Sequence, residues 1–346
     1  MLLNNIIVKF LSYLKNDRGF TDETIKKYSS NLRIMFNRMR ITDLNQVQDS
    51  VINKRLLDDF WNSIQAGKVF SESTRVSYLS SLKAFLRYLH EFGYIQEDIS
   101  QKIVMPKPRM VYLEGLTNDE QKRLREYIAS HLKTETDLRN AALIMFLWAT
   151  AARISEALAL NCHPDSYIYF HDERVISGDF FTEEGKIYVH IRGKGKRDRK
   201  IIVSDDALAY LNLYLHERKV KNEILFQGHR RDSGYYGSRL KRNGAYHAIK
   251  KVLDACEIKR DPGVMTHILR HTAINTWIEK GISDQQIITM TGHSSPVGLN
   301  IYHARNKKLT DIFGEKAKAT IDLNDRYLKK MEDLLKLRHS TQRMRF

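Results

Sequence analysis

Two prolines, in Met105-Pro106-Lys107-Pro108-Arg109, interrupt a chain whose apolar residues otherwise recur mainly at helical spacing. Proline fixes its own φ and disfavours helix at the residue before it, so no regular helix continues through this segment. At 346 residues the chain also exceeds an ordinary single domain. We therefore expect a helical domain over residues 1–100, a linker over 101–116 and a second domain from residue 117.

The N-terminal domain is predicted to contain four or five helices. Residues 1–14 are predicted to form an amphipathic first helix, since polar residues break the apolar run and argue against a signal or membrane segment. Another helix is expected over Leu56–Ile64. Two longer helices are expected, one from the plausible N-cap Thr21 and one that follows Ser73 or Thr74 and stops at Gly93. Their apolar stripes are Ile25, Tyr28, Leu32, Met35 and Phe36, and Val76, Leu79, Leu82, Phe85, Leu86 and Leu89.

The second domain is predicted to be helical with one small β-hairpin. Thr117-Asn118-Asp119-Glu120 has capping-box spacing and should start its first helix. Residues 185–192 and 199–203 have strand character and flank the basic turn Gly193-Lys194-Gly195, whereas residues 143–147 and 207–214 favour helix. The expected fold class is therefore mainly α with a small β-hairpin or sheet, an α+β second domain.

Charge favours a polyanionic partner. The chain has 57 Lys and Arg against 41 Asp and Glu, a net charge of +16 that is spread over both predicted domains. Hydrophobic residues at 42% are typical of globular proteins. Only Cys162 and Cys256 are present, so a disulfide framework and a four-cysteine metal site are excluded, and a reduced cytosol fits.

Several short segments carry basic or nucleophilic side chains, and each alone has a simpler interpretation. Arg153-Ile154-Ser155-Glu156 is typical of a solvated helix start with an ion pair three residues apart. Lys194 at its turn is typical of an exposed loop lysine, and Gly292-His293 of a turn. Tyr302 is one of 17 tyrosines, most of which must serve core or surface.

His267 and His271 are four residues apart, near one face of a helix, a spacing that also occurs in zinc sites. A zinc metalloprotease would have glutamate directly after the first histidine and a third ligand elsewhere. Ile268 stands in that place, so the pattern disfavours zinc.

Together these segments match the needs of phosphoryl transfer. Attack on a phosphodiester adds negative charge to the phosphate oxygens, which two arginines and a histidine donor can stabilise; Arg153, Arg270 and His293 suit this task. Tyr302 could attack once deprotonated, because a protonated phenol is a weak nucleophile.

In the order Arg153, Lys194, His267-x-x-Arg270, Gly292-His293 and Tyr302, the chain resembles the tyrosine recombinase (integrase) family, most closely its bacterial Xer-like branch. The resemblance implies that Tyr302 is the nucleophile and His267 its base or proton acceptor. It assigns the proton donor for the leaving 5′ oxygen to Lys194, with Lys196 in reserve. Glu156 would orient Arg153 or His267, and His271 would hydrogen-bond within the same site.

The resemblance also implies architecture and activity. Residues 1–100 would be a SAM-like core-binding domain, 117–320 the catalytic domain and 321–346 a C-terminal helix with a basic tail, in a two-domain C-shaped clamp on DNA. The implied activity is site-specific recombination through a 3′-phosphotyrosyl intermediate and a Holliday junction, without metal, ATP or another cofactor. Double-stranded recombination sites, a homotetramer on two sites and an accessory protein are the implied partners, in a bacterial cytosol at the nucleoid, with no membrane association.

Two rival functions share much of this pattern. A type IB topoisomerase or telomere resolvase would use the same tyrosine and arginines without exchanging partners, but the length and Xer-like order favour recombination. A catalytically silent DNA-binding regulator would keep the charge and lose site residues, and none is lost here.

Three positions depart from the family's common pattern. Ala151 stands where glycine often precedes the first arginine, Thr291 replaces a frequent leucine before Gly-His, and His303 follows the tyrosine. Beyond the site, an amphipathic helix is expected over residues 324–337. The resemblance implies that this helix docks on a neighbouring subunit, with packing on its own domain as the alternative. Its apolar stripe is Tyr327, Leu328, Met331, Leu334 and Leu335.

Overall fold

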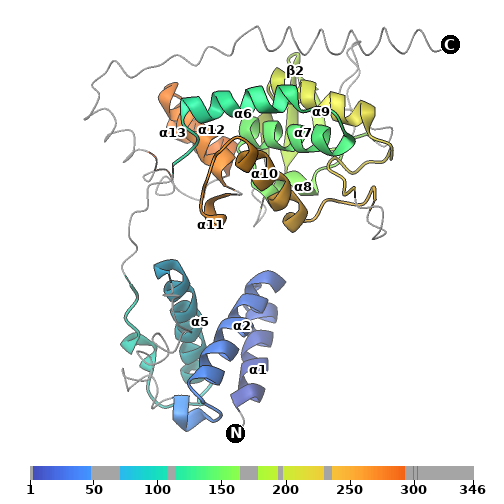
Figure 1. Ribbon diagram of the computed structural model, residues 1–346. Helices are drawn as coiled ribbons and strands as arrows, with labels where there is room; N and C mark the ends of the chain where they lie inside the picture. The colour runs from blue at the N-terminus through green and yellow to red at the C-terminus, as the bar shows by residue number, and fades with distance from the viewer. Residues whose placement is uncertain are drawn as a thin grey trace, which may run out of the picture. The chain divides into compact units, whose positions relative to one another are not determined.

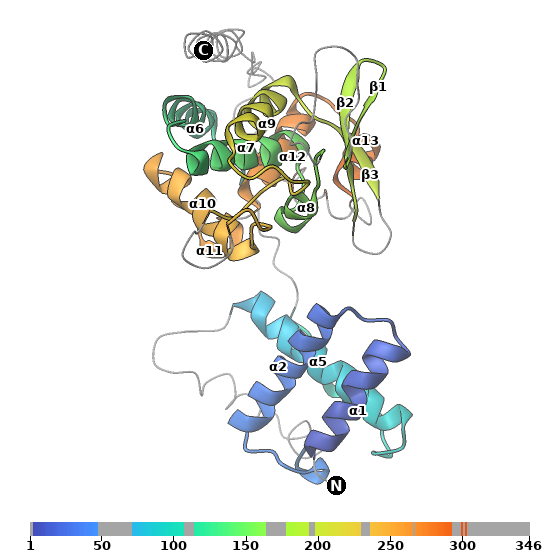
Figure 2. The same ribbon diagram turned by 90° about the vertical axis from the view of Figure 1, so that its right-hand side faces the viewer.

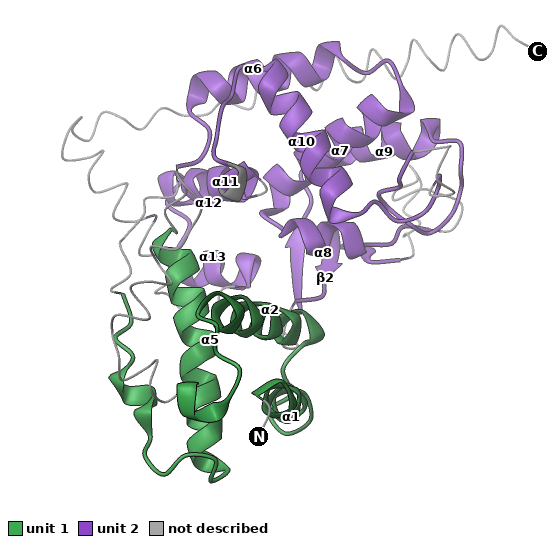
Figure 3. Ribbon diagram, turned by 60° about the horizontal axis from the view of Figure 1, so that its bottom comes forward, with its two compact units in different colours: residues 1–110 green, residues 111–346 purple. Residues whose placement is uncertain are grey.

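A computed structural model describes residues 3–47, 71–106, 114–163, 178–193, 198–229, 236–265, 267–292, 299 and 302. Contacts within the chain divide it into two compact units, residues 1–110 and 111–346, each with its own apolar core (Figure 3). The helices expected over Leu56–Ile64 and 324–337 lie outside the described residues.

The described part of the first unit contains three long helices packed side by side (Figure 1). Its core centres on Phe10, Leu32, Leu82 and Phe85, which are fully buried. The ring of Phe10 meets that of Phe85 edge-on, with centroids 5.2 Å apart. The elements are α1 (Leu3–Asn16), α2 (Asp22–Arg38), α5 (Glu72–Glu91) and the 3₁₀ helix η1 (Ile99–Lys102).

Two predicted helix ends in this unit are confirmed and one predicted helix start is corrected. Thr21 caps α2 as predicted, and Gly93 lies just beyond α5 with φ of +70°. The predicted start of α5, after Ser73 or Thr74, is wrong, because the helix begins at Glu72. Ser71 is the cap, because its backbone is extended and its hydroxyl accepts the Thr74 N–H at 3.2 Å.

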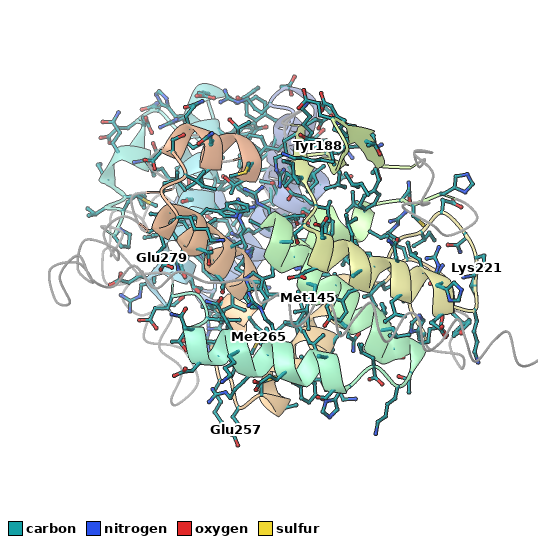
Figure 4. All side chains as sticks on the ribbon, turned by 90° about the horizontal axis from the view of Figure 1, so that it is seen from above. Met145, Tyr188, Lys221, Glu257, Met265 and Glu279 are labelled. Atoms are coloured by element: carbon teal, nitrogen blue, oxygen red, sulfur yellow. The ribbon has the colours of Figure 1, made fainter. Side chains whose placement is uncertain are left out.

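The second unit surrounds the buried helix α7 with α8, α9, α10 and α12 (Figures 1 and 2). Figure 4 shows the exposed side chains of Lys221, Glu257 and Glu279 at its margin, whereas Met145 and Met265 are buried. The helices among its described residues are α6 (Asn118–Ser130), α7 (Glu135–Thr150), α8 (Ile154–Ala159), α9 (Asp205–Glu217), α10 (Arg242–Ala255), α11 (Pro262–Met265), α12 (Ile268–Glu279) and α13 (Asp284–Thr291). The predicted capping box is confirmed, since Thr117 and Glu120 cap the start of α6 reciprocally.

A three-stranded antiparallel sheet lies at one side of this unit, in the order β1 (Phe180–Glu183), β2 (Lys186–Ile191) and β3 (Arg199–Ile202) (Figure 2). The predicted hairpin is confirmed as β2 and β3, which pair Ile191 with Arg199 and Val189 with Ile201. Strand β1 was not predicted. The prediction of a mainly α protein with a small sheet is confirmed.

Cys162 and Cys256 are buried free thiols. Within the described part of the chain, no helix is both long and apolar enough to cross a membrane.

Candidate active site

Arg153 is the residue at which the chain enters α8. Its guanidinium Nη1 donates to Oε1 of Glu156 at 2.9 Å, and its backbone N–H donates to Oε2 of the same carboxylate at 2.8 Å. The Arg153 side chain is 39% exposed, whereas that of Glu156 is 6% exposed. The ion pair of a simple helix start is therefore present, but its carboxylate is buried and its guanidinium faces outward.

Arg270, on α12, connects the ends of two other helices. Its Nη1 donates to the carbonyl of Ala151 at 2.5 Å, and its Nη2 donates to the carbonyl of Thr291 at 3.0 Å. These carbonyls lie at the C-terminal ends of α7 and α13, where a cation is favourable. Burial and the nearby charge of Arg153 lower the pKa of Arg270 to about 10, so it stays protonated at neutral pH.

The backbone of Ala151 has a conformation that glycine adopts more readily than alanine. Ala151 has φ of +50°, in the left-handed region that glycine adopts without strain. This conformation ends α7 and turns the Ala151 carbonyl toward Arg270. The alanine therefore keeps the geometry at a conformational cost.

Tyr302 and His271 are in direct contact. The Tyr302 hydroxyl lies 2.7 Å from His271 Nδ1, and both residues are buried, at 3% and 8% exposure. Burial raises the pKa of Tyr302 to about 12, although the charges of Arg270 and Arg153 act to lower it. The phenol is therefore protonated at neutral pH, and it can react as a nucleophile only if its proton passes to a neighbour.

His267 lies at the start of α12, one turn before His271. The two imidazole centroids are 6.1 Å apart. Burial, followed by the charges of Arg270, Arg242 and Arg153, lowers the pKa of His267 below its usual value, so its ring is neutral at pH 7. The structure thus places His271 in contact with Tyr302, whereas the family resemblance assigned the role of base or proton acceptor to His267.

Arg199 is a member of this site that the sequence analysis missed. It donates to Glu156 through Nη1 at 3.2 Å and Nη2 at 2.7 Å. Burial alone would raise the pKa of Glu156, but hydrogen bonds from Arg199 and Arg153 outweigh it and lower the pKa. The carboxylate expected to orient Arg153 or His267 therefore binds Arg153 and Arg199. An arginine at an inward-facing strand position was the available signal.

Lys194, Lys196, His293 and His303 lie outside the described residues. Their described chain neighbours are Gly193 and Asp198 for the lysines and Gly292 for His293. In the described ranges no three His, Cys, Asp or Glu side chains are grouped as a metal site would require. Arg153, Arg270, the two histidines and the phenol can together bind an oxyanion and deprotonate a hydroxyl. Glu156 and Arg199 form the ion-pair network behind Arg153.

Comparison with known proteins gives consistent matches. Residues 114–308 match the phage integrase family. The tyrosine recombinase XerD of Oceanobacillus iheyensis is 26% identical over 317 residues, covering 90% of this chain and 98% of the relative.

Two solved structures have the same fold. The XerH site-specific recombinase bound to palindromic difH substrate, in a post-cleavage complex, gives a TM-score of 0.63 at 21% identity over 88% of this chain and 83% of its own. A lambda integrase tetramer bound to a Holliday junction gives 0.58 at 17% identity over 86% of this chain and 78% of its own.

Proposed function

Because the chain belongs to the phage integrase family and is a tyrosine site-specific recombinase, we propose that Tyr302 cuts DNA by forming a 3′-phosphotyrosyl bond. The observation that carries this proposal is the Tyr302 hydroxyl held on His271 beside the charges of Arg270 and Arg153. A buried phenol with a histidine partner and two cations has the parts of an activated nucleophile.

In the cleavage step, the Tyr302 oxygen bonds to phosphorus as the bond to the 5′ oxygen breaks. His271 accepts the phenolic proton in this account, because its Nδ1 is within hydrogen-bond distance. This requires the tautomer that carries its proton on Nε2. His267, neutral at pH 7, is the second candidate acceptor.

Arg153 and Arg270 stabilise the charge that develops on the non-bridging phosphate oxygens. Arg153 is half exposed and would meet the phosphate directly, whereas Arg270 is held in place by two backbone carbonyls. His293 would add a third donor. Lys194 would protonate the departing 5′ oxygen, with Lys196 as the alternative donor.

The phosphotyrosyl bond conserves the energy of the broken phosphodiester, so rejoining needs no ATP. The free 5′ hydroxyl of a partner strand attacks this bond, and two such rounds pass through a Holliday junction. We infer that four copies act on two double-stranded sites, with an accessory protein controlling them. The DNA-bound XerH structure and the lambda integrase tetramer on a Holliday junction support this assignment.

The test is to incubate the protein with a pool of nicked duplexes that share a randomised central segment. Covalent complexes are isolated under denaturing conditions, and the attached DNA is sequenced to obtain the cleavage site. A recombinase exchanges strands between two differently labelled duplexes carrying that site. Relaxation or resealing without exchange would indicate a topoisomerase or resolvase, and the absence of any covalent complex would indicate a silent regulator.

A further inference from the structure

Arg199 begins β3 with its side chain turned into the protein. Alternate residues of this segment are buried, and the other inward positions, Ile201 and Val203, are apolar. The Arg199 side chain is only 4% exposed. Burying a guanidinium is costly unless it is fully paired, so its contacts define what it does.

The guanidinium of Arg199 joins three segments of the site. Nη1 and Nη2 bind the Glu156 carboxylate in a fork, and Nε donates to the carbonyl of Met290 at 2.9 Å. Met290 belongs to α13, which lies beside β3 (Figure 2). Arg199 therefore ties the hairpin that leads to Lys194 to the helix that leads to His293.

The close packing of Arg199 extends to Gly292, where α13 ends in the left-handed conformation. A Cβ at Gly292 would lie 3.2 Å from Nη1 of Arg199 and 3.4 Å from its Cδ. The backbone turn at Gly292, directly before His293, thus packs against the Arg199 guanidinium.

Glu156 carries the effect of Arg199 to Arg153. Its Oε1 accepts from both guanidinium groups, at 3.2 Å from Arg199 and 2.9 Å from Arg153. Arg199 binds the Glu156 carboxylate from the buried side, and Arg153 binds the same carboxylate from the side that faces solvent. Without Arg199, the Glu156 carboxylate could rotate, and the Arg153 guanidinium bound to it would change position as well.

We propose that Arg199 is a positioning residue of the recombination reaction, which aims Arg153 through Glu156 and fixes the turn before His293. The inference rests on the proposed function, since it assumes that Arg153 binds the scissile phosphate. Arg199 itself does not touch DNA in this account. Its loss should therefore weaken charge stabilisation at the phosphate and leave DNA affinity nearly unchanged.

The test compares two nicked duplexes built on the recovered cleavage site, one with an ordinary scissile phosphate and one with a methylphosphonate. The methylphosphonate lacks the charged oxygen that Arg153 would stabilise. Arg199→Lys keeps a cation opposite Glu156 but cannot form the fork. We expect it to slow covalent-complex formation about 10- to 100-fold on ordinary DNA, a typical cost for losing a supporting hydrogen bond, and far less on methylphosphonate DNA.

Arg139→Lys is the matched control, because Arg139 is buried and hydrogen-bonded to Asn140 and Gln227 without contacting Glu156. It should lower thermal stability and affect both duplexes equally. Arg199→Gln, which keeps a donor but no charge, serves as the second variant and should show the same selective loss as Arg199→Lys.

Equal slowing on both duplexes, an unchanged rate, or failure of both Arg199 variants to fold would each overturn the positioning role. In an Arg153→Ala background, Arg199→Lys should cause a smaller further loss on ordinary DNA than it causes in wild type, because the route through Glu156 is already removed and only the turn before His293 is still affected. Fully additive losses would contradict the proposal. If wild type forms no covalent complex, the proposed function fails instead, so the two failures are distinct.

Discussion

The hydroxyl of Tyr302 lies 2.7 Å from Nδ1 of His271, a histidine that directly follows Arg270 on α12. The proposed nucleophile and the group that can take its proton are thus hydrogen-bonded to each other. The proposed proton acceptor and the proposed phosphate-binding Arg270 are thus adjacent residues of the same helix.

His271→Gln should retain DNA binding and slow covalent-complex formation by about 10²- to 10⁴-fold, because glutamine can hydrogen-bond but cannot accept the proton. Single-turnover assays on a nicked duplex would measure the rate, and band shifts would measure binding. His267→Gln is the matched variant one turn away. A large loss in His267→Gln with a normal rate in His271→Gln would return the role of base to His267.

The pH profile of cleavage should separate two routes to the phenolate. With a Tyr302 pKa of about 12, direct loss of the proton to solvent would make the rate rise about tenfold per pH unit through neutrality. Transfer to a neutral imidazole should instead give a plateau above the pKa of that imidazole. If His267 is the acceptor, the rate should begin to fall only at a pH below 6.5, the usual pKa of histidine, because the pKa of His267 is lowered. We expect the plateau, and a continuous rise to alkaline pH would rule out histidine as the acceptor.

Gly292→Ala should destabilise the protein and slow cleavage. Gly292 and Gly281 both have left-handed φ values, +66° and +75°, so alanine at either should cost about 1 kcal/mol of unfolding free energy. Only Gly292 has Arg199 against the added Cβ, whereas Gly281 has open space. Urea unfolding should show a larger loss of unfolding free energy in Gly292→Ala than in Gly281→Ala. Single-turnover cleavage should be slowed in Gly292→Ala alone. Identical behaviour of the two variants would show that the Arg199 contact has no effect.

Cleavage should proceed at an unchanged rate after dialysis against excess EDTA, because Arg153 and Arg270 are expected to supply the positive charge that a metal supplies in other nucleases. Covalent-complex formation before and after chelation is the measurement. Recovery of a lost rate only on adding Mg²⁺ or Zn²⁺ would contradict this mechanism.

Local sequence signals predicted most helices and the hairpin, since amphipathic stripes and caps depend on neighbouring residues. The start of α5 was misplaced because Ser71, Ser73 and Thr74 all have capping side chains and only backbone geometry selects Ser71. Strand β1 was missed because it has only four residues, with the sequence FFTE, in which apolar and polar side chains do not alternate.

The chemistry of the site depended on contacts distant in sequence. In the sequence, Arg199 cannot be told apart from the other basic residues of the hairpin. Its burial becomes understandable only through its ion pair with Glu156, which lies 43 residues earlier in the chain. His267 and His271 lie one turn apart, so spacing alone cannot show which one meets Tyr302. Only the contact between His271 and Tyr302 in the folded chain decides it.

The most direct test of the central claim is covalent trapping by Tyr302→Phe, which removes the phenolic oxygen and keeps the ring. Tyr246→Phe, at a partly buried tyrosine of the same unit, is the matched control. On a nicked duplex carrying the recovered site, wild type and Tyr246→Phe should give a protein–DNA band that survives denaturing electrophoresis. Tyr302→Phe should shift the same duplex in a native gel and give no such band. Undiminished covalent trapping by Tyr302→Phe would show that another residue attacks the phosphate.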